Sequence, residues 1–314
     1  MRTALLLALA AATLALPSIL DGQQLGIYVL AGLAAMVTVG LSLLMGYAGQ
    51  ISLGQASFYA IGAYTAGLLA VHGTPPLLGL LAAPVVAATF ATVVGIGVLR
   101  LRGHYLAFAT LAMQLILLSV LAQSEWAGGA IGLQGIPQLS VGSVELDEDI
   151  HYAYLVWAGL AVTLLVARNL VASRAGRGLR ALATSEVAAA ASGVPVGRYR
   201  LAVFALSAAF AGLAGGIYAF YLGYLGPGSF PVLLSVEYVV MAVVGGLGTV
   251  AGGVVGAVAI VLLVQLLNDI GTQPGMPSYA PSVLSYAVYG LLLVLVVLYL
   301  PRGIVPALRR GERS

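Results

Sequence analysis

The chain has 314 residues, of which 61% are hydrophobic and 7% are charged, with a formal net charge of +3. Because soluble domains carry roughly 25% charged residues, this composition excludes a soluble protein and predicts an all-α polytopic membrane protein with a single transmembrane domain over residues 1–314. The chain contains no lysine and no cysteine, which excludes an ATP-binding P-loop, disulfides and cysteine-based metal sites.

Nine apolar stretches approach or exceed the ~20 residues that an α-helix needs to span a bilayer. They cover residues 5–20, 25–45, 53–71, 77–99, 104–122, 152–167, 201–222, 231–267 and 283–300. The first stretch follows Met1-Arg2-Thr3 and superficially resembles a signal peptide, but no small-x-small cleavage motif follows it. We therefore expect this stretch to be retained as a first span.

The arginines predict the orientation of these spans, because arginine collects in cytoplasmic loops. Segments 100–102, 168–200 and 302–313 carry all but one of the arginines, whereas segment 123–150 carries five acidic residues and no arginine. We therefore predict that both termini and segment 168–200 are cytoplasmic and that segment 123–150 is outside.

This orientation requires an even number of crossings, so the long stretch 231–267 must contain two spans. A break near 245–249, where three glycines interrupt the apolar run, gives about ten transmembrane helices. The piece 231–244 then extends only ~21 Å, which is short for a hydrocarbon core of ~30 Å. We expect this piece to be tilted, or re-entrant and buried against protein.

The polar segment 168–200 is predicted to be a docking platform. Ser185 can cap a short helix whose first turn contains Glu186, and the alanine run that follows has the highest helix propensity. Gly193 and Pro195 end this helix, and Gly193 is expected to adopt a positive φ. The segment contains six of the thirteen arginines, at Arg168, Arg174, Arg177, Arg180, Arg198 and Arg200.

The arrangement of these side chains favours contact with a partner. Arg174, Arg177 and Arg180 recur every three residues, so they fan along one side of a preceding helix. The alanine face of the short helix, which includes Ala189, permits close approach, and Glu186 can meet a basic residue of the partner. Because little else of the chain is expected in water, this segment is the predicted docking site.

Two polar groups interrupt the apolar spans. Gln50, Ser52 and Gln55 lie in a glycine-containing stretch between two spans, and such a break at membrane depth indicates a substrate path. The alternative is an ordinary cytoplasmic turn. Thr110 and Gln114 are four residues apart and share a helix face, as side chains beside a pore would. The alternative for this pair is a hydrogen bond between helices.

Other polar residues predict no catalytic or metal site. The three histidines have no ligand spacing, and no nucleophile–base arrangement is evident, so we expect neither an enzyme nor a cofactor. The glycine-rich stretch 244–257 lacks the strand and lysine of a phosphate loop, and Gly252 with Gly256 favours close helix packing. Glu237 is the best-placed acidic residue within a span, where it would be the coupling site of an ion-coupled secondary carrier.

Several motifs follow one another in an order that is similar to a known family. They are residues 46–58 and 61–64, 102–111, 128–137, 176–182, 204–216, 245–249, and 289–303. Together they resemble the branched-chain amino-acid ABC transporter permeases of the Liv type. Ser52-Leu53-Gly54-Gln55 stands where the H subunit has an Asn-Phe-Ala-His-Gly-like stretch, so the resemblance is to the M subunit. The acidic segment 145–149 is not part of it.

The resemblance implies a pore-forming subunit in the cytoplasmic membrane of a bacterium or archaeon. Its partners would be an H-type permease subunit, two cytoplasmic ABC ATPase subunits and an extracytoplasmic substrate-binding protein, with the lipid bilayer around them and no nucleic acid. The spacing of Glu186 and Gly193 resembles the loop through which such permeases contact their ATPases. Near relatives import urea and short amides, which is the alternative substrate class. A non-transporting membrane scaffold fits the polar linings poorly.

Overall fold

The computed structural model describes residues 13–101, 103–141, 144–272, 287–288, 290–291 and 303–311. Within them, eight long helices form the bundle: α2 (Gly22–Ala48), α3 (Gln55–Val71), α4 (Pro76–Val98), α5 (His104–Gln123), α6 (Asp149–Ala172), α9 (Val196–Leu222), α10 (Val232–Gly245) and α11 (Val250–Gly271). Shorter elements connect or follow them: η1 (Leu16–Ser18), η2 (Glu125–Ala127), β1 (Leu139–Val141), β2 (Val144–Leu146), α7 (Arg174–Thr184), α8 (Glu186–Ala191), η3 (Pro227–Ser229) and α13 (Ile304–Gly311).

Seven of the described helices are long and apolar enough to cross a membrane. They are α2, α4, α5, α6, α9, α11 and the segment Pro227–Gly245 that contains α10. Helix α3 is shorter, at 17 residues, and most of its side chains are buried. The prediction of a polytopic α-helical membrane protein is confirmed. Of the predicted spans, most of 5–20 and most of 283–300 lie outside the described residues.

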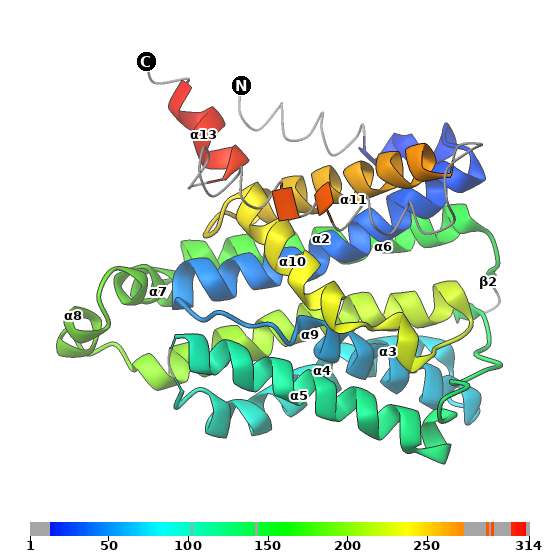
Figure 1. Cartoon of the computed structure of the whole chain (residues 1–314), viewed down its shortest axis with the longest axis horizontal. Coiled ribbons are helices and arrows are strands. Elements are labelled where there is room, and N and C mark those ends of the chain that lie inside the picture. Colours follow the sequence, from blue (N-terminus) through cyan, green and yellow to red (C-terminus); the bar gives the residue numbers. More distant parts are fainter. Residues whose placement is uncertain are drawn as a thin grey trace.

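One element was not predicted. Strands β1 and β2 form a two-stranded antiparallel hairpin, with Leu139 opposite Leu146. Strands of three residues are too short for their alternation to be recognised in a sequence. Figure 1 shows that β2 lies at one end of the bundle and that α7 and α8 project at the other.

Helix α9 is the central element, and it packs against α2, α3 and α4. On α4, Ala83, Ala87 and Ala91 recur every four residues and are fully buried, so they form one small face. This face contacts α9 so closely that a β-carbon on Gly212 would meet the Ala83 carbonyl and the Ala87 side chain. The opposite face of α4 carries exposed Val85, Val93 and Ile96, as expected of a surface that contacts lipid.

The predicted break in the long stretch 231–267 is present, because α10 ends at Gly245 and α11 begins at Val250. The two helices then run back against each other. A β-carbon on Gly252 would meet the Gly245 and Gly246 carbonyls, and one on Gly256 would meet the Met241 carbonyl. The interpretation of these glycines as close-packing residues is therefore confirmed.

The break also fixes the position of neighbouring segments. The Gly248 N–H donates to the Ser42 carbonyl at 3.3 Å, which joins the break to the last turns of α2. Gly303, just before α13, lies against Gly246, since a β-carbon there would meet Gly246 backbone atoms. Helix α13 therefore starts at the end of the bundle where α2 finishes.

Candidate functional site

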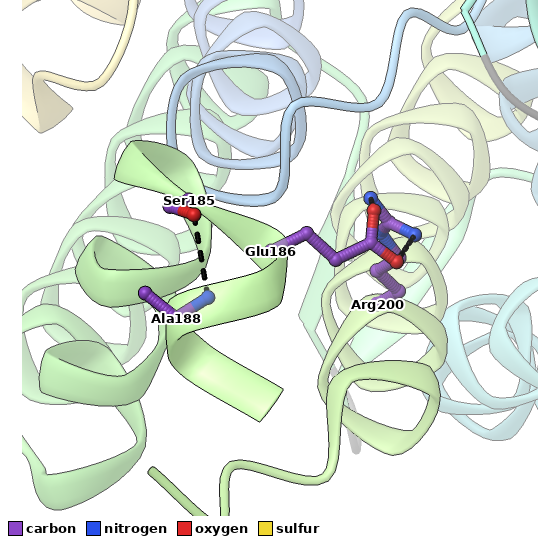
Figure 2. A network of polar contacts seen from close by, with 4 residues as sticks. All are labelled: Ser185, Glu186, Ala188 and Arg200. Carbon is purple, nitrogen blue, oxygen red and sulfur yellow. Dashed lines mark hydrogen bonds and ion pairs between the residues drawn. The ribbon is translucent and has the colours of Figure 1, made fainter. Parts of the chain in front are cut away.

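Segment 168–200 folds as two short helices, as the sequence predicts. The Ser173 hydroxyl accepts a hydrogen bond from the Gly176 N–H at 3.2 Å and caps α7. The Ser185 hydroxyl accepts one from the Ala188 N–H at 3.3 Å and caps α8, as Figure 2 shows. These capping bonds satisfy N–H groups that have no partner within the helix. The two helices project from the bundle beside the start of α9 (Figure 1).

The end of α8 is formed by Gly193. Its φ is +80°, its N–H donates to the Ala190 carbonyl, and the next N–H, of Val194, donates to the Ala189 carbonyl, both at 3.0 Å. This pair of bonds is the Schellman motif. The predicted positive φ is confirmed, and it turns the chain so that α9 begins beside α8.

This reversal brings two opposite charges together. Arg200, in the first turns of α9, donates from Nη1 to Oε1 of Glu186 at 3.1 Å and from Nη2 to Oε2 at 3.0 Å. Figure 2 shows the guanidinium and the carboxylate facing each other. Such two-bond pairs fix geometry as well as contributing energy. The carboxylate that was expected to meet a base of a partner is therefore bound to a residue of its own chain.

The outer surface of α8 is made by Val187, Ala188, Ala190 and Ala191, which are exposed. Val187 is 81% exposed, whereas Ala189 is only 1% exposed. Ala189 was expected to take part in docking, but its side chain faces the protein. It lies on the inner face of the helix, so it supports α8 and is not available for direct contact with a partner.

The predicted row of arginines lies on the exposed side of α7. Arg174, Arg177 and Arg180 are all exposed, whereas Leu179 and Leu182 are buried beneath them. Arg180 also donates from Nη1 to the Val171 carbonyl at 3.0 Å, near the end of α6, where a positive charge is favourable. The three arginines give α7 a basic outer face.

The polar residues between α2 and α3 are buried, which does not fit an ordinary cytoplasmic turn. Gln50, Ser52 and Gln55 are at most 3% exposed. The Leu53 N–H donates to the Thr110 hydroxyl of α5 at 2.9 Å, and the Gln55 amide donates to the Ser207 hydroxyl of α9 at 3.1 Å. The irregular backbone is thus satisfied by protein, as a membrane interior requires.

Helix α10 adds Ser235 to this group of buried polar residues. The polar cluster consists of Gln50, Ser52, Gln55, Thr110, Gln114, Ser207 and Ser235. The Ala56 N–H donates to the Ser235 hydroxyl at 2.9 Å, and that hydroxyl donates to Oε1 of Gln114 at 2.7 Å. Gln114 in turn donates to the Pro231 carbonyl at 3.3 Å. The predicted residues Gln55, Thr110 and Gln114 therefore make hydrogen bonds to neighbouring segments, which is the alternative considered for Thr110 and Gln114.

Two hydrogen-bond acceptors in the polar cluster have no donor among the described residues. Oε1 of Gln50 and Oε1 of Gln55 are buried, and neither has a hydrogen-bond donor among the described residues. Buried polar atoms without a partner are uncommon in proteins, because each costs free energy.

A cavity of about 290 Å³ lies beside the cluster. One face of α10 lines it with Leu234, Glu237, Tyr238 and Met241, and α2, α11, Tyr59 and Tyr218 supply the other walls. From the sequence, Glu237 was interpreted only as the coupling site of a carrier, and the cavity was not predicted. The available signal was the three- and four-residue spacing of these α10 positions, which places them on one helix face.

The comparisons with known proteins agree with this architecture. The model of the family "Branched-chain amino acid transport system / permease component" matches residues 24–297. The chain is 32% identical to the high-affinity branched-chain amino acid transport system permease protein LivM of Escherichia coli K12, over 90% of this chain and 68% of that protein.

Two further relatives extend the similarity. The chain is 25% identical to the probable permease LivM of Methanocaldococcus jannaschii, over 88% of this chain and 91% of that protein. It is 26% identical to the permease BraD of Pseudomonas aeruginosa, over 86% and 91% respectively. No solved structure matches the chain significantly. The match to the family model and the identity to LivM show that this chain belongs to the family of branched-chain amino-acid transport permease components.

Proposed function

We propose that this multi-pass membrane protein is one permease subunit of an ABC importer for branched-chain amino acids. The observation that carries the proposal is the family match over residues 24–297, together with relatives whose names state this transport system. In the proposal, the chain forms the substrate pathway with a second, H-type permease. ATP hydrolysis takes place in two separate cytoplasmic subunits, and an extracytoplasmic binding protein delivers the substrate.

The proposed topology has ten membrane spans and both termini in the cytoplasm. The eight long helices supply eight spans, and residues 5–20 and 283–300 are proposed as the first and last. The position of the arginine-rich α7 at the opposite end of the bundle from the hairpin supports this orientation (Figure 1). Arginine in α13 would then also be inside, consistent with the start of α13 near Gly246.

Segment 168–200 is proposed as the docking site for an ATPase subunit. The exposed apolar surface of α8, with Val187 at its centre, supports this role, because a solvent-exposed apolar helix face favours a protein partner. The exposed Arg177 and Arg180 would contact the rim of that partner. Gly193 and Glu186 would hold α8 at the correct angle rather than contact the ATPase themselves.

Gln50, Ser52, Gln55, Thr110 and Gln114 are proposed to line the substrate pathway where it is closed in this conformation. The two open acceptors, on Gln50 and Gln55, support this proposal, since a moving helix or a passing substrate could supply the missing donors. In this conformation Gln55 is hydrogen-bonded to Ser207 of α9 and Gln114 to Ser235 of α10, which is consistent with a gate that opens when α5, α9 and α10 move apart.

A transport assay tests the proposed function. The chain and its partner subunits are reconstituted in liposomes containing ATP, and uptake of labelled leucine, isoleucine and valine is measured beside uptake of urea. We expect uptake of the branched-chain amino acids only. Uptake of urea alone would assign the alternative substrate class and contradict the proposal.

A further inference from the structure

The cavity beside the polar cluster contains a carboxylate that no described residue neutralises. Glu237 lines the cavity and is half-buried within α10. In the part of the chain that the structure describes, the ion pairs join Glu186 to Arg200 and Asp147 to His151, and no hydrogen bond to the Glu237 side chain is present. An ionisable group within a membrane is costly, and it is characteristically functional.

The walls around this carboxylate come mainly from faces of α2, α10 and α11, with Tyr59 of α3 and Tyr218 of α9. Leu234 and Met241 flank Glu237 on α10 at a spacing of three and four residues, while α2 contributes Leu33 and α11 contributes Val261. Aliphatic side chains therefore make about half of the lining, and Glu237 is its one acidic group. The rest of the lining is polar or aromatic, from Ser229, Gln265, Asn268 and three tyrosines. A volume of about 290 Å³ is close to the lower limit of the range of ~300–1,000 Å³ typical of small-molecule sites.

The cavity lies in the half of the bundle that is away from the docking platform. Helix α9 leaves α8 at its first residues and reaches the cavity only at Tyr218, near its last turn. The cavity also adjoins the polar cluster, because Tyr59 is one turn beyond Ala56, and Leu234 precedes the Ser235 that binds the Ala56 N–H. A solute in the cavity would therefore be next to the closed pathway, on its outer side.

We propose that this cavity is a binding site for the imported amino acid, with Glu237 pairing with its ammonium group and the aliphatic walls holding its branched side chain. The proposal rests on the proposed function and deepens it by naming the group that recognises the substrate's positive charge. The occupant is a small alkylammonium compound because the site combines aliphatic side chains with a carboxylate that no described residue neutralises. A lipid chain would need the walls but not the carboxylate, and a fatty acid anion would be repelled by it.

Binding measurements on the assembled transporter test this assignment. The transporter is purified in lipid nanodiscs without its binding protein and titrated with leucine, with isoamylamine, which lacks the carboxylate, and with isocaproate, which lacks the amine. We expect wild type to bind leucine and isoamylamine but not isocaproate. Glu237→Gln should weaken amine binding about ten-fold to a hundred-fold, as expected for one charge-assisted hydrogen bond, and Glu237→Asp should retain part of it.

The control is Glu125→Gln, which neutralises an exposed carboxylate on η2 outside the cavity and should leave amine binding unchanged. Equal amine binding by wild type and Glu237→Gln would overturn the proposal, and so would the absence of amine binding by wild type. Loss of the second permease from the Glu237→Gln complex would also overturn it, because the cavity would then be a subunit interface. Leucine uptake by the wild-type transporter is measured in parallel, and its absence would contradict the proposed function separately.

Discussion

Arg200 holds Glu186 through two parallel hydrogen bonds, of 3.1 and 3.0 Å, and so joins the short helix α8 to the long central helix α9. Both side chains are mostly shielded from water, with exposed fractions of 19% for Arg200 and 31% for Glu186. Since α9 packs on α2, α3 and α4, a displacement of α8 would be passed directly to the centre of the bundle.

Removing this ion pair should uncouple the proposed motor while the membrane helices stay folded. Arg200→Ala and Glu186→Ala should each cost roughly 1 kcal/mol locally and reduce the stimulation of ATPase activity by the loaded binding protein. The exchanged pair, Glu186→Arg with Arg200→Glu, should restore part of that stimulation because the opposite charges again face each other. Full stimulation in both single variants would show that the pair does not transmit the motion.

Gly193→Val should misdirect α8. A β-carbon at this position meets no atom within 4 Å, so its cost of ~1–2 kcal/mol comes from the positive φ alone. The matched control is Gly197→Val, where a β-carbon also meets open space but φ is not positive. We expect co-purification of the ATPase to fall for Gly193→Val and to be unchanged for Gly197→Val. Equal co-purification of both variants would contradict a role for this turn in docking.

Thr110→Val and Gln50→Ala separate a packing role from a pathway role. Thr110→Val leaves the Leu53 N–H without its acceptor and should lower stability by about 1–3 kcal/mol, as well as lowering uptake. Gln50→Ala removes a side chain whose oxygen has no described donor, so it should lower uptake with little loss of stability. The control is Thr163→Val, because the Thr163 hydroxyl is buried without a described partner. Normal uptake by the Gln50 and Thr110 variants at normal abundance would leave these residues as helix-packing groups only.

Gly212→Ala should separate α9 from α4. The added methyl would overlap the Ala83 carbonyl and the Ala87 side chain, and overpacking of this kind typically costs 1–3 kcal/mol. Gly97→Ala, on an exposed part of α4 with open space around it, should be neutral or stabilise by roughly 0.5–1 kcal/mol. Thermal unfolding of the two variants in detergent measures the difference. An unchanged midpoint for Gly212→Ala would contradict the close contact between α4 and α9.

Features that depend on local sequence could be predicted. The cap at Ser185, the positive φ of Gly193 and the break between α10 and α11 each follow from a few adjacent residues with strong backbone preferences. The polar residues around Gln55 and Thr110 could also be identified from the sequence, because polar groups are conspicuous within apolar spans.

Features that depend on tertiary packing could not be predicted. Glu186 and Arg200 are fourteen residues apart, and only the turn at Gly193 brings them together. The inward direction of Ala189 depends on how α8 lies against the bundle, because all residues of an alanine run look alike in sequence. The cavity around Glu237 is formed by residues of α2, α3, α9, α10 and α11, so no single stretch of sequence contains it.

The proposed topology is tested by single cysteines, since the chain has none of its own. Gln138→Cys lies beside the hairpin and Ala183→Cys lies on α7, and both positions are exposed. In intact cells, a membrane-impermeant thiol reagent should label the first and not the second, whereas both should react after the membrane is permeabilised. Labelling of Ala183→Cys alone in intact cells would show the opposite orientation and contradict the proposed topology.

Measuring which energy source drives leucine uptake tests most directly the claim that this protein is part of an ABC importer. Leucine uptake is measured in liposomes that contain the complete transporter, with ATP inside, and is repeated with a hydrolysis-deficient ATPase subunit and with an imposed proton gradient in place of ATP. We predict uptake with ATP and the active ATPase, and none in the other two conditions. Uptake that persists with the inactive ATPase and follows the proton gradient would identify a secondary carrier and contradict an ABC importer.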